Sequence, residues 1–216
     1  MERTCLIAGK SGALLTDVVR HCSEARRQPL VARSGQAELP DLPPGSPAPI
    51  SWNRRSALSA RSLLLHAQTT CGRIEEAIVI YSPVHESNPF HASTIVSIED
   101  RVDAEVKGYL FLLRELVALF ESQRSGRLVL AVSDRSAELP SPLEAAGLAS
   151  FMALSRSLQD LYEGESLRVR LCYSTADDTD AFARVVAGEL DVRDRRRSKS
   201  GWLTFPPRSR VRSVLS

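Results

Sequence analysis

The sequence alternates between short apolar runs of strand length and longer stretches with helical periodicity. The strand-length runs are Thr4–Ala8, Pro29–Arg33, Ile50–Trp52, Ala77–Tyr81, Leu128–Val132 and Leu167–Tyr173. The helical patterns occupy about residues 13–26, Arg55–Cys71, Asp103–Ser122, Pro142–Tyr162 and Asp177–Glu189. Such alternation predicts right-handed βαβ units and a parallel sheet covered on both faces. We therefore expect an α/β fold with a Rossmann-like, doubly wound parallel sheet in three layers.

The run Ala77–Tyr81 is the clearest strand, because it is continuous and rich in β-branched residues, as in strands buried on both faces. Residues 35–48 are rich in Pro, Gly and Ser and predict a loop. In a doubly wound sheet, ligands bind beyond the carboxyl ends of the strands, where the strand order reverses. The candidate site is expected there.

A basic segment follows the expected domain. We assign residues 1–192 to one Rossmann-like domain and residues 193–216 to a basic C-terminal segment with an edge strand at Trp202–Phe205. Residues 193–212 hold eight basic side chains and one acid, which leaves a formal −5 on the rest of a chain whose net charge is +2. We interpret this segment as a solvated terminus; the alternative is an anionic partner such as nucleic acid, a phosphorylated ligand or anionic lipid.

Membrane, secreted and metal-binding classes are not indicated. No apolar stretch reaches the roughly 20 residues of a membrane helix, and Met1–Ile7 lacks the apolar region of a signal peptide. The four cysteines form no CxxC pair, which favours reduced thiols in a cytoplasmic protein. His85, Glu86 and His91 share one loop, but the histidines show no recognised ligand spacing, so no metal is expected.

The first strand-to-helix turn, Gly9-Lys10-Ser11-Gly12, has the position at which dinucleotide folds receive a pyrophosphate. Leu15 stands where a third glycine would complete the motif, so a large side chain is expected either to push the helix off the sheet or to fill space that the phosphates use. Lys10 and Arg33 would suit a phosphate, which indicates NADP if any cofactor binds. The alternative is that both are solvated loop cations.

With these elements placed, the chain resembles the short-chain dehydrogenase/reductase family over nearly its whole length. The similar segments are Gly72–Ile74 with Ala77–Tyr81, Gly108–Phe111, Gly126–Ser133 and Leu154–Leu158. The resemblance implies a Rossmann fold, a nicotinamide cofactor and hydride transfer. It also implies candidate cofactor-binding positions, which are Gly9, Lys10, Ser11, Gly12, Arg33, Asn53 and Tyr81.

The chain departs from the family pattern at the catalytic positions. The family's serine falls on Ser133 and is retained, but its Tyr-x-x-x-Lys pair falls on Glu144 and Leu148, and no such pair occurs in the sequence. Hydride transfer of this type needs a phenol whose pKa is lowered by a nearby ammonium. The family's helix asparagine falls on Glu105, and Asn53 lies near its adenine-binding acid.

Structural roles account for the remaining polar candidates. Ser141, Pro142 and Glu144 have the spacing of a capping box at a helix N-terminus. Without a base, Ser133 is expected to be a strand-end hydroxyl. Glu75 and Glu76 precede a strand at its amino end and are expected to be solvated.

The two long helices, about residues 103–122 and 142–162, are apolar on much of their surface. A helix packed only on a sheet needs one apolar stripe, so this pattern predicts a homodimer, as the resemblance also implies. We predict a catalytically degenerate member of this fold that acts as a binding, structural or regulatory homo-oligomer. The alternative is a divergent NADP(H)-dependent oxidoreductase using Ser133 with Tyr81 or Glu144.

Overall fold

The computed structural model describes residues 3–34, 42, 46–83, 89–135, 140–162, 165–192 and 201–206. They contain a seven-stranded sheet with the order β3-β2-β1-β4-β5-β6-β7, in which neighbouring strands are parallel. The strands are β1 (Arg3–Lys10), β2 (Arg27–Ser34), β3 (Ile50–Ser51), β4 (Glu76–Tyr81), β5 (Gly126–Ser133), β6 (Leu167–Ser174) and β7 (Leu203–Phe205). The predicted Rossmann-like α/β fold is confirmed.

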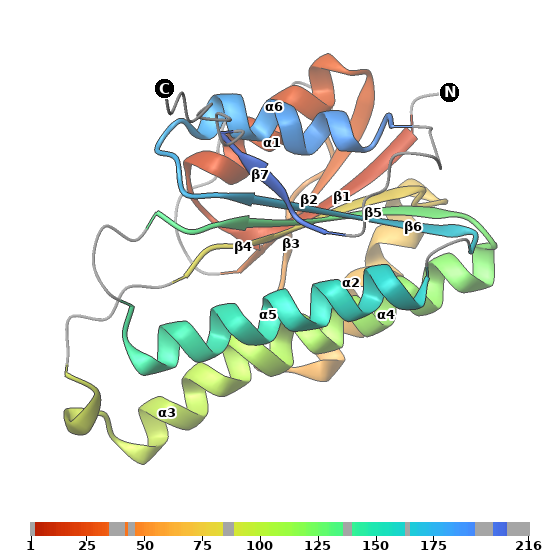
Figure 1. The fold of residues 1–216 in the computed structure, drawn as a ribbon. Coiled ribbons are helices and arrows are strands. Elements are labelled where there is room, and N and C mark those ends of the chain that lie inside the picture. Colours follow the sequence, from red (N-terminus) through yellow and green to blue (C-terminus); the bar gives the residue numbers. More distant parts are fainter. Residues whose placement is uncertain are drawn as a thin grey trace, which may run out of the picture.

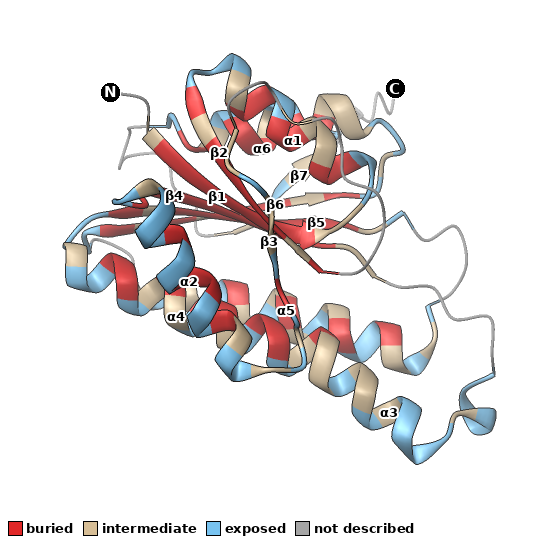
Figure 2. Cartoon of the chain, turned by 180° about the vertical axis from the view of Figure 1, so that it is seen from behind, coloured by how far each residue is buried: buried red, intermediate tan, exposed pale blue. Residues whose placement is uncertain are grey.

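Helices cover both faces of the sheet and complete three layers (Figure 1). One face carries α1 (Ala13–Glu24) and α6 (Thr179–Glu189). The opposite face carries α2 (Ala57–Cys71), α4 (Gly108–Gln123) and α5 (Pro142–Leu161). Buried residues concentrate along the central strands and the helix sides that face them, as Figure 2 shows.

Strand β4 illustrates how the sequence builds two cores at once. All six of its residues are buried, and its side chains alternate between the faces. Ala77, Val79 and Tyr81 join the apolar cluster under α2, α4 and α5, whereas Ile78 and Ile80 join the cluster under α1 and α6. A strand that contributes to two cores must be apolar along the length that enters them, which is the continuous pattern of Ala77–Tyr81.

The helix after β4 begins earlier than predicted. Instead of starting at Asp103, it starts with α3 (Ile95–Val102) and passes through a π-helical segment, η2 (Asp103–Lys107), into α4. A short 3-10 helix, η1 (Phe90–Ala92), precedes it. The side chain of Thr94 caps α3 by accepting a hydrogen bond from the Ser97 N–H. No residue of α3 is buried, although Ile95, Ile98 and Val102 recur in its sequence with helical spacing.

The prediction that the Glu75–Glu76 pair is solvated is wrong for Glu76. This side chain is 1% exposed and bonds to Arg3, Arg27 and Arg127. Three guanidinium groups replace the water that a buried carboxylate loses. The prediction missed this because the partners come from the amino ends of three other strands.

The four cysteines are free thiols. At the start of α5, Ser141 and Glu144 form the predicted capping box, with Pro142 in the first turn. No helix in the described ranges has the length and apolarity needed to cross a bilayer.

The capping box gives a first test. We expect Ser141→Ala to lower the free energy of unfolding by about 1 kcal/mol, because the Glu144 N–H at the start of α5 loses its acceptor. Urea denaturation measures this loss. Ser157→Ala, at an exposed position within the same helix, is the matched control and should leave stability unchanged or slightly raised. Equal effects of the two substitutions would contradict the capping role.

Candidate functional site

The candidate site lies at the carboxyl ends of β1 and β4. The order β3-β2-β1-β4-β5-β6-β7 reverses direction between these two strands, so their connections leave toward opposite sides of the sheet. In open α/β sheets this is where a ligand crevice forms. The residues that surround it come from β1, from the segment after β4, from the β3–α2 connection and from η2.

Gly9 is needed here because the backbones of β1 and β4 approach closely. A Cβ atom at Gly9 would lie 3.1 Å from Ile80 Cβ and 3.4 Å from the Ile80 carbonyl oxygen. The same position would be 3.7 Å from Leu15 Cδ1. Leu15 is 1% exposed and packs in the apolar cluster under α1 and α6. The large side chain therefore fills the inner side of the turn, as the sequence predicts.

Lys10 bridges the carboxyl edge of the sheet. The sequence predicts Lys10 in the turn after β1, but in the structure Lys10 is the last residue of β1 itself. Its Nζ donates to the Ser82 carbonyl oxygen at 2.7 Å and forms an ion pair with Glu105 Oε1 at 3.0 Å. One side chain thus ties the end of β1 to the segment after β4 and to η2.

Glu105 collects two more cations. Arg54 Nη1 lies 3.0 Å and Arg101 Nη1 lies 3.8 Å from Glu105 Oε1, and the Glu105 side chain is 4% exposed. We call Lys10, Arg54, Arg101 and Glu105 the Glu105 cluster. Burial lowers the pKa of Lys10 to about 8, although the neighbouring Glu105 opposes this shift. The cluster has three cationic groups for one carboxylate.

An aromatic group packs beneath this cluster. The Tyr81 ring stacks on Phe151 with centroids 5.0 Å apart and lies 5.2 Å from the Tyr109 ring. A Cβ atom at Gly147 of α5 would lie 2.6 Å from the Tyr81 hydroxyl, so the phenol end abuts α5. Lys10 Nζ lies 5.9 Å from the Tyr81 ring centroid. Burial, reinforced by Glu105, raises the pKa of Tyr81.

The two catalytic candidates have different surroundings. Along β5, Val129 and Ala131 belong to the cluster under α1 and α6, and strand alternation puts Ser133 in the same series. Tyr81 belongs to the cluster on the opposite face. Glu144 is buried in the capping box of α5. The structure brings Tyr81 and Lys10 together, but it does not add Ser133 to that group.

The remaining candidates lie around the turn and the β2 end. Asn53 is exposed, and its Oδ1 accepts the Arg55 N–H at 3.0 Å, which shapes the turn before α2. Arg33 is half-buried near the end of β2. At the turn, Gly12 leaves α1 without a side-chain cap, and the buried Ser11 Oγ forms no hydrogen bond within the described ranges.

Sequence reasoning did not select Arg54, Arg101 or Glu105 as site residues. A signal was present for Glu105, because it lies four residues before Tyr109 and seven before Leu112 on a helical face that is otherwise apolar. A carboxylate on such a face needs a partner. No spacing rule identified its partners, which reach it from β1, α3 and the β3–α2 connection.

Metal ligands do not assemble in the part of the chain that is described, where no group of three His, Cys, Asp or Glu side chains is suitably placed. Of the loop residues considered from the sequence, His85 and Glu86 lie outside the described residues. His91 lies in η1 and is exposed.

Comparison with known proteins identifies the fold. The chain matches no protein-family model and no curated protein sequence. It is similar to the crystal structure of a metagenomic short-chain oxidoreductase (SDR) in complex with NADP, with a TM-score of 0.73 and 12% sequence identity over 94% of each chain. The chain has an SDR-like fold. At this identity the likeness concerns architecture, and the chemistry must be judged from the residues present.

Those residues do not fit a nicotinamide dinucleotide at the switch point. Leu15 fills the inner side of the turn, and the Lys10 amine is already bonded to Ser82 and Glu105. The Tyr81 phenol has a raised pKa and abuts Gly147, whereas a proton donor for a carbonyl needs a lowered pKa. The features of the described residues that favour an anion at this edge include the uncapped α1 and the Ser11 hydroxyl.

The pKa of Lys10 makes stability depend on pH in a defined direction. Between about pH 8 and 10.5 the unfolded chain keeps a proton on Lys10 that the folded chain has lost, so this group makes the folded state more stable as pH rises. We expect the stability difference between wild type and Lys10→Met to shift by about 2 kcal/mol in favour of wild type between about pH 7.5 and 9.5.

Urea denaturation at several pH values measures this difference. Other titrating groups, including the buried cysteines, occur in both proteins and cancel in the comparison. Parallel pH profiles for wild type and Lys10→Met would mean that the Lys10 amine is not buried against Glu105.

Proposed function

We propose that this chain is a catalytically degenerate protein of the SDR-like fold that acts through binding, as a structural or regulatory homo-oligomer. The observation that supports this most directly is the bridge from Lys10 to Ser82 and Glu105 across the switch point. A side chain bonded in this way would have to leave a buried carboxylate before a dinucleotide could use the same space. The free energy of that exchange opposes cofactor binding.

The electrostatics of Tyr81 support the same proposal. A tyrosine that protonates a carbonyl oxygen must give up its proton readily in the active site. Burial and the neighbouring Glu105 carboxylate act against ionisation of Tyr81. Although Lys10 lies near the ring, its charge is directed to Glu105 rather than to the phenol hydroxyl.

The alternative function is a divergent NADP(H)-dependent oxidoreductase. It is favoured by the uncapped N-terminus of α1 and the unpaired Ser11 hydroxyl beside it within the described ranges. The SDR of similar architecture was crystallised with NADP. Under this alternative, the Lys10 amine would exchange Glu105 for a phosphate.

A homodimer through helices 103–122 and 142–162 is part of the proposal. Most apolar residues of α5 are at least partly buried against the chain's own core, which reduces the surface left for a partner. Large apolar side chains nevertheless stay exposed on the two helices, with Leu110 at 43% and Leu161 at 68%. A two-fold contact would cover them.

Cofactor titration tests the main proposal. We expect millimolar NADPH or NADP⁺ to leave the thermal unfolding temperature of the wild type unchanged, because the space is filled and the Lys10 amine is paired. A ligand present at 100 times its Kd would stabilise the fold by about 2.7 kcal/mol, which this measurement detects. An NADPH-dependent reductase in the same assay is the positive control.

A saturable rise in unfolding temperature would contradict the proposal. If Lys10→Glu then removed the rise while Arg184→Glu, at an exposed position on α6, retained it, the alternative function would be supported.

Light scattering after size exclusion tests the homodimer. We expect wild-type protein at twice the 23.7 kDa chain mass, and we expect Leu110→Glu and Leu161→Glu to give monomers, because each puts a charge into the covered apolar surface. Leu58→Glu is the matched control, since Leu58 is exposed on α2, outside the proposed contact. A monomeric wild type would contradict the proposed contact.

A further inference from the structure

A row of charged residues crosses the amino edge of the sheet, at the end opposite to the Glu105 cluster. Glu76 of β4 is in register with Arg127 of β5, which is in register with Arg168 of β6. On the other flank, Arg3 of β1 is in register with Arg27 of β2. Four arginines from neighbouring strands therefore accompany one buried glutamate.

Two carboxylates, those of Glu76 and Asp191, form ion pairs with three of the four arginines in this row. Glu76 Oε1 binds Arg3 Nη1 at 2.5 Å and Arg127 Nη1 at 2.9 Å, while its Oε2 binds Arg27 Nε at 2.6 Å. On the flank of β1 and β2, Asp191 Oδ1 adds contacts with Arg27 Nη2 at 2.6 Å and Arg3 Nη2 at 3.4 Å. Here a second oxyanion bridges two neighbouring guanidinium groups.

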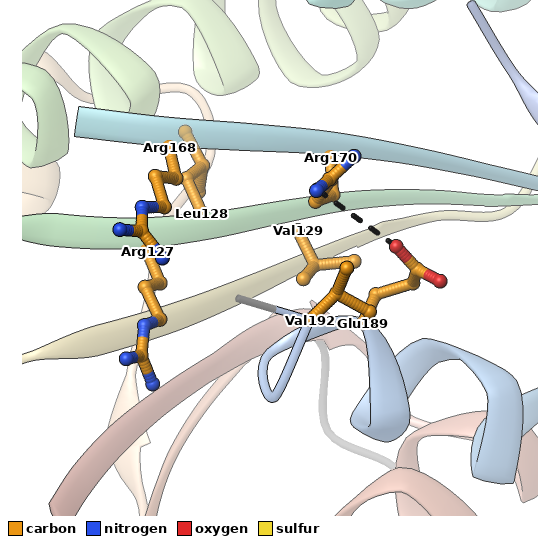
Figure 3. A pocket seen from close by; sticks show the side chains of 7 residues that line it. All are labelled: Arg127, Leu128, Val129, Arg168, Arg170, Glu189 and Val192. Atoms are coloured by element: carbon orange, nitrogen blue, oxygen red, sulfur yellow. Dashed lines mark ion pairs between the residues drawn. The ribbon is translucent and has the colours of Figure 1, made fainter. Parts of the chain in front are cut away.

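The flank of β5 and β6 lacks the corresponding oxyanion. The side chain of Arg168 forms no ion pair or hydrogen bond with any residue in the part of the chain that is described, although Arg168 is half-buried. It lines a hollow with Arg127, Arg170 and Glu189 (Figure 3). The single carboxylate there, Glu189, lies with its Oε2 3.9 Å from Arg170 Nε, so Figure 3 shows this pair at one end and Arg127 and Arg168 at the other.

The charges of the hollow favour an anion. Arg127 pairs with Glu76 and Arg170 with Glu189, so within the described residues it is Arg168 whose positive charge no carboxylate balances. Like charges at directly opposed positions on neighbouring strands destabilise a sheet, so Arg127 and Arg168 repel each other when nothing lies between them. Guanidinium groups bind phosphate oxygens with paired hydrogen bonds, and a phosphate monoester has a charge near −2 at neutral pH.

We propose that the hollow between β5, β6 and the end of α6 binds a phosphate group, held mainly by Arg127 and Arg168. Val129 and Val192 supply an apolar wall beside it. On this flank the phosphate would bridge Arg127 and Arg168, as the carboxylate of Asp191 bridges Arg3 and Arg27 on the other flank. It lies at the amino ends of the strands, so it is separate from the switch point and independent of the function proposed above.

Thermal unfolding in rising concentrations of inorganic phosphate tests this site, with sodium chloride adjusted to keep the ionic strength constant. We expect a saturable rise in the unfolding temperature of the wild type. In Arg168→Met the phosphate affinity should fall about tenfold or more, because a charge-assisted hydrogen-bond donor is lost. Without phosphate, Arg168→Met should unfold at or above the wild-type temperature, because the repulsion with Arg127 is removed.

Arg184→Met is the matched control, because this exposed arginine lies on the same helix as Glu189 and pairs only with Asp180 among the described residues. It should keep the full response to phosphate. A wild type without a response, or an equal response in Arg168→Met, would overturn the proposal.

The same titration with a sugar monophosphate and with a short single-stranded oligonucleotide distinguishes the source of the phosphate. A small phosphorylated ligand is indicated if the sugar phosphate binds more tightly than inorganic phosphate. A nucleic-acid backbone is indicated if the oligonucleotide binds more tightly and with a steep dependence on salt. Arg168→Met should lose the tighter binding of either ligand, and tight binding retained in that variant would contradict the proposed phosphate site.

Discussion

The ion pair between Lys10 and Glu105 fixes the carboxyl edge of this fold. A carboxylate with 4% of its side chain exposed is costly unless it is paired, and Lys10, Arg54 and Arg101 supply the pairing from three separate segments. The same amine holds the carbonyl of Ser82 after β4. Because one charged group joins these segments, the space at which the sheet order reverses is occupied by the protein itself.

At each end of the sheet a buried glutamate is paired with cationic side chains, but at the amino end Arg168 stays outside the ion pairs of the described residues. Each end has one buried glutamate, Glu105 or Glu76, and each glutamate is surrounded by three cationic side chains. Such networks hold strand ends together only while every member is satisfied. At the carboxyl end the cations converge on Glu105, whereas at the amino end Arg168 lies beyond the reach of the network. Among the described residues, this arginine without a carboxylate therefore lies at the amino end of the sheet, away from the crevice at the switch point.

The sequence predicted the strands and most helices because those segments bury apolar side chains with a clear period. The capping box at Ser141 was also predictable, since it depends on residues within one turn. The partners of Glu76 and Glu105 were not, because each charge is satisfied by residues from distant segments that only the sheet brings together. The start of α3 was within reach of the sequence, because Ile95, Ile98 and Val102 recur with helical spacing after the N-cap Thr94, although no residue of this helix is buried.

A crystal structure of the protein grown with millimolar NADPH tests the central claim most directly. The account predicts that Lys10 Nζ keeps its contacts with Ser82 and Glu105, that the Tyr81 ring stays stacked on Phe151, and that no dinucleotide lies across the ends of β1 and β4. A dinucleotide bound there, with the Lys10 amine turned from Glu105 to its phosphates, would contradict the account.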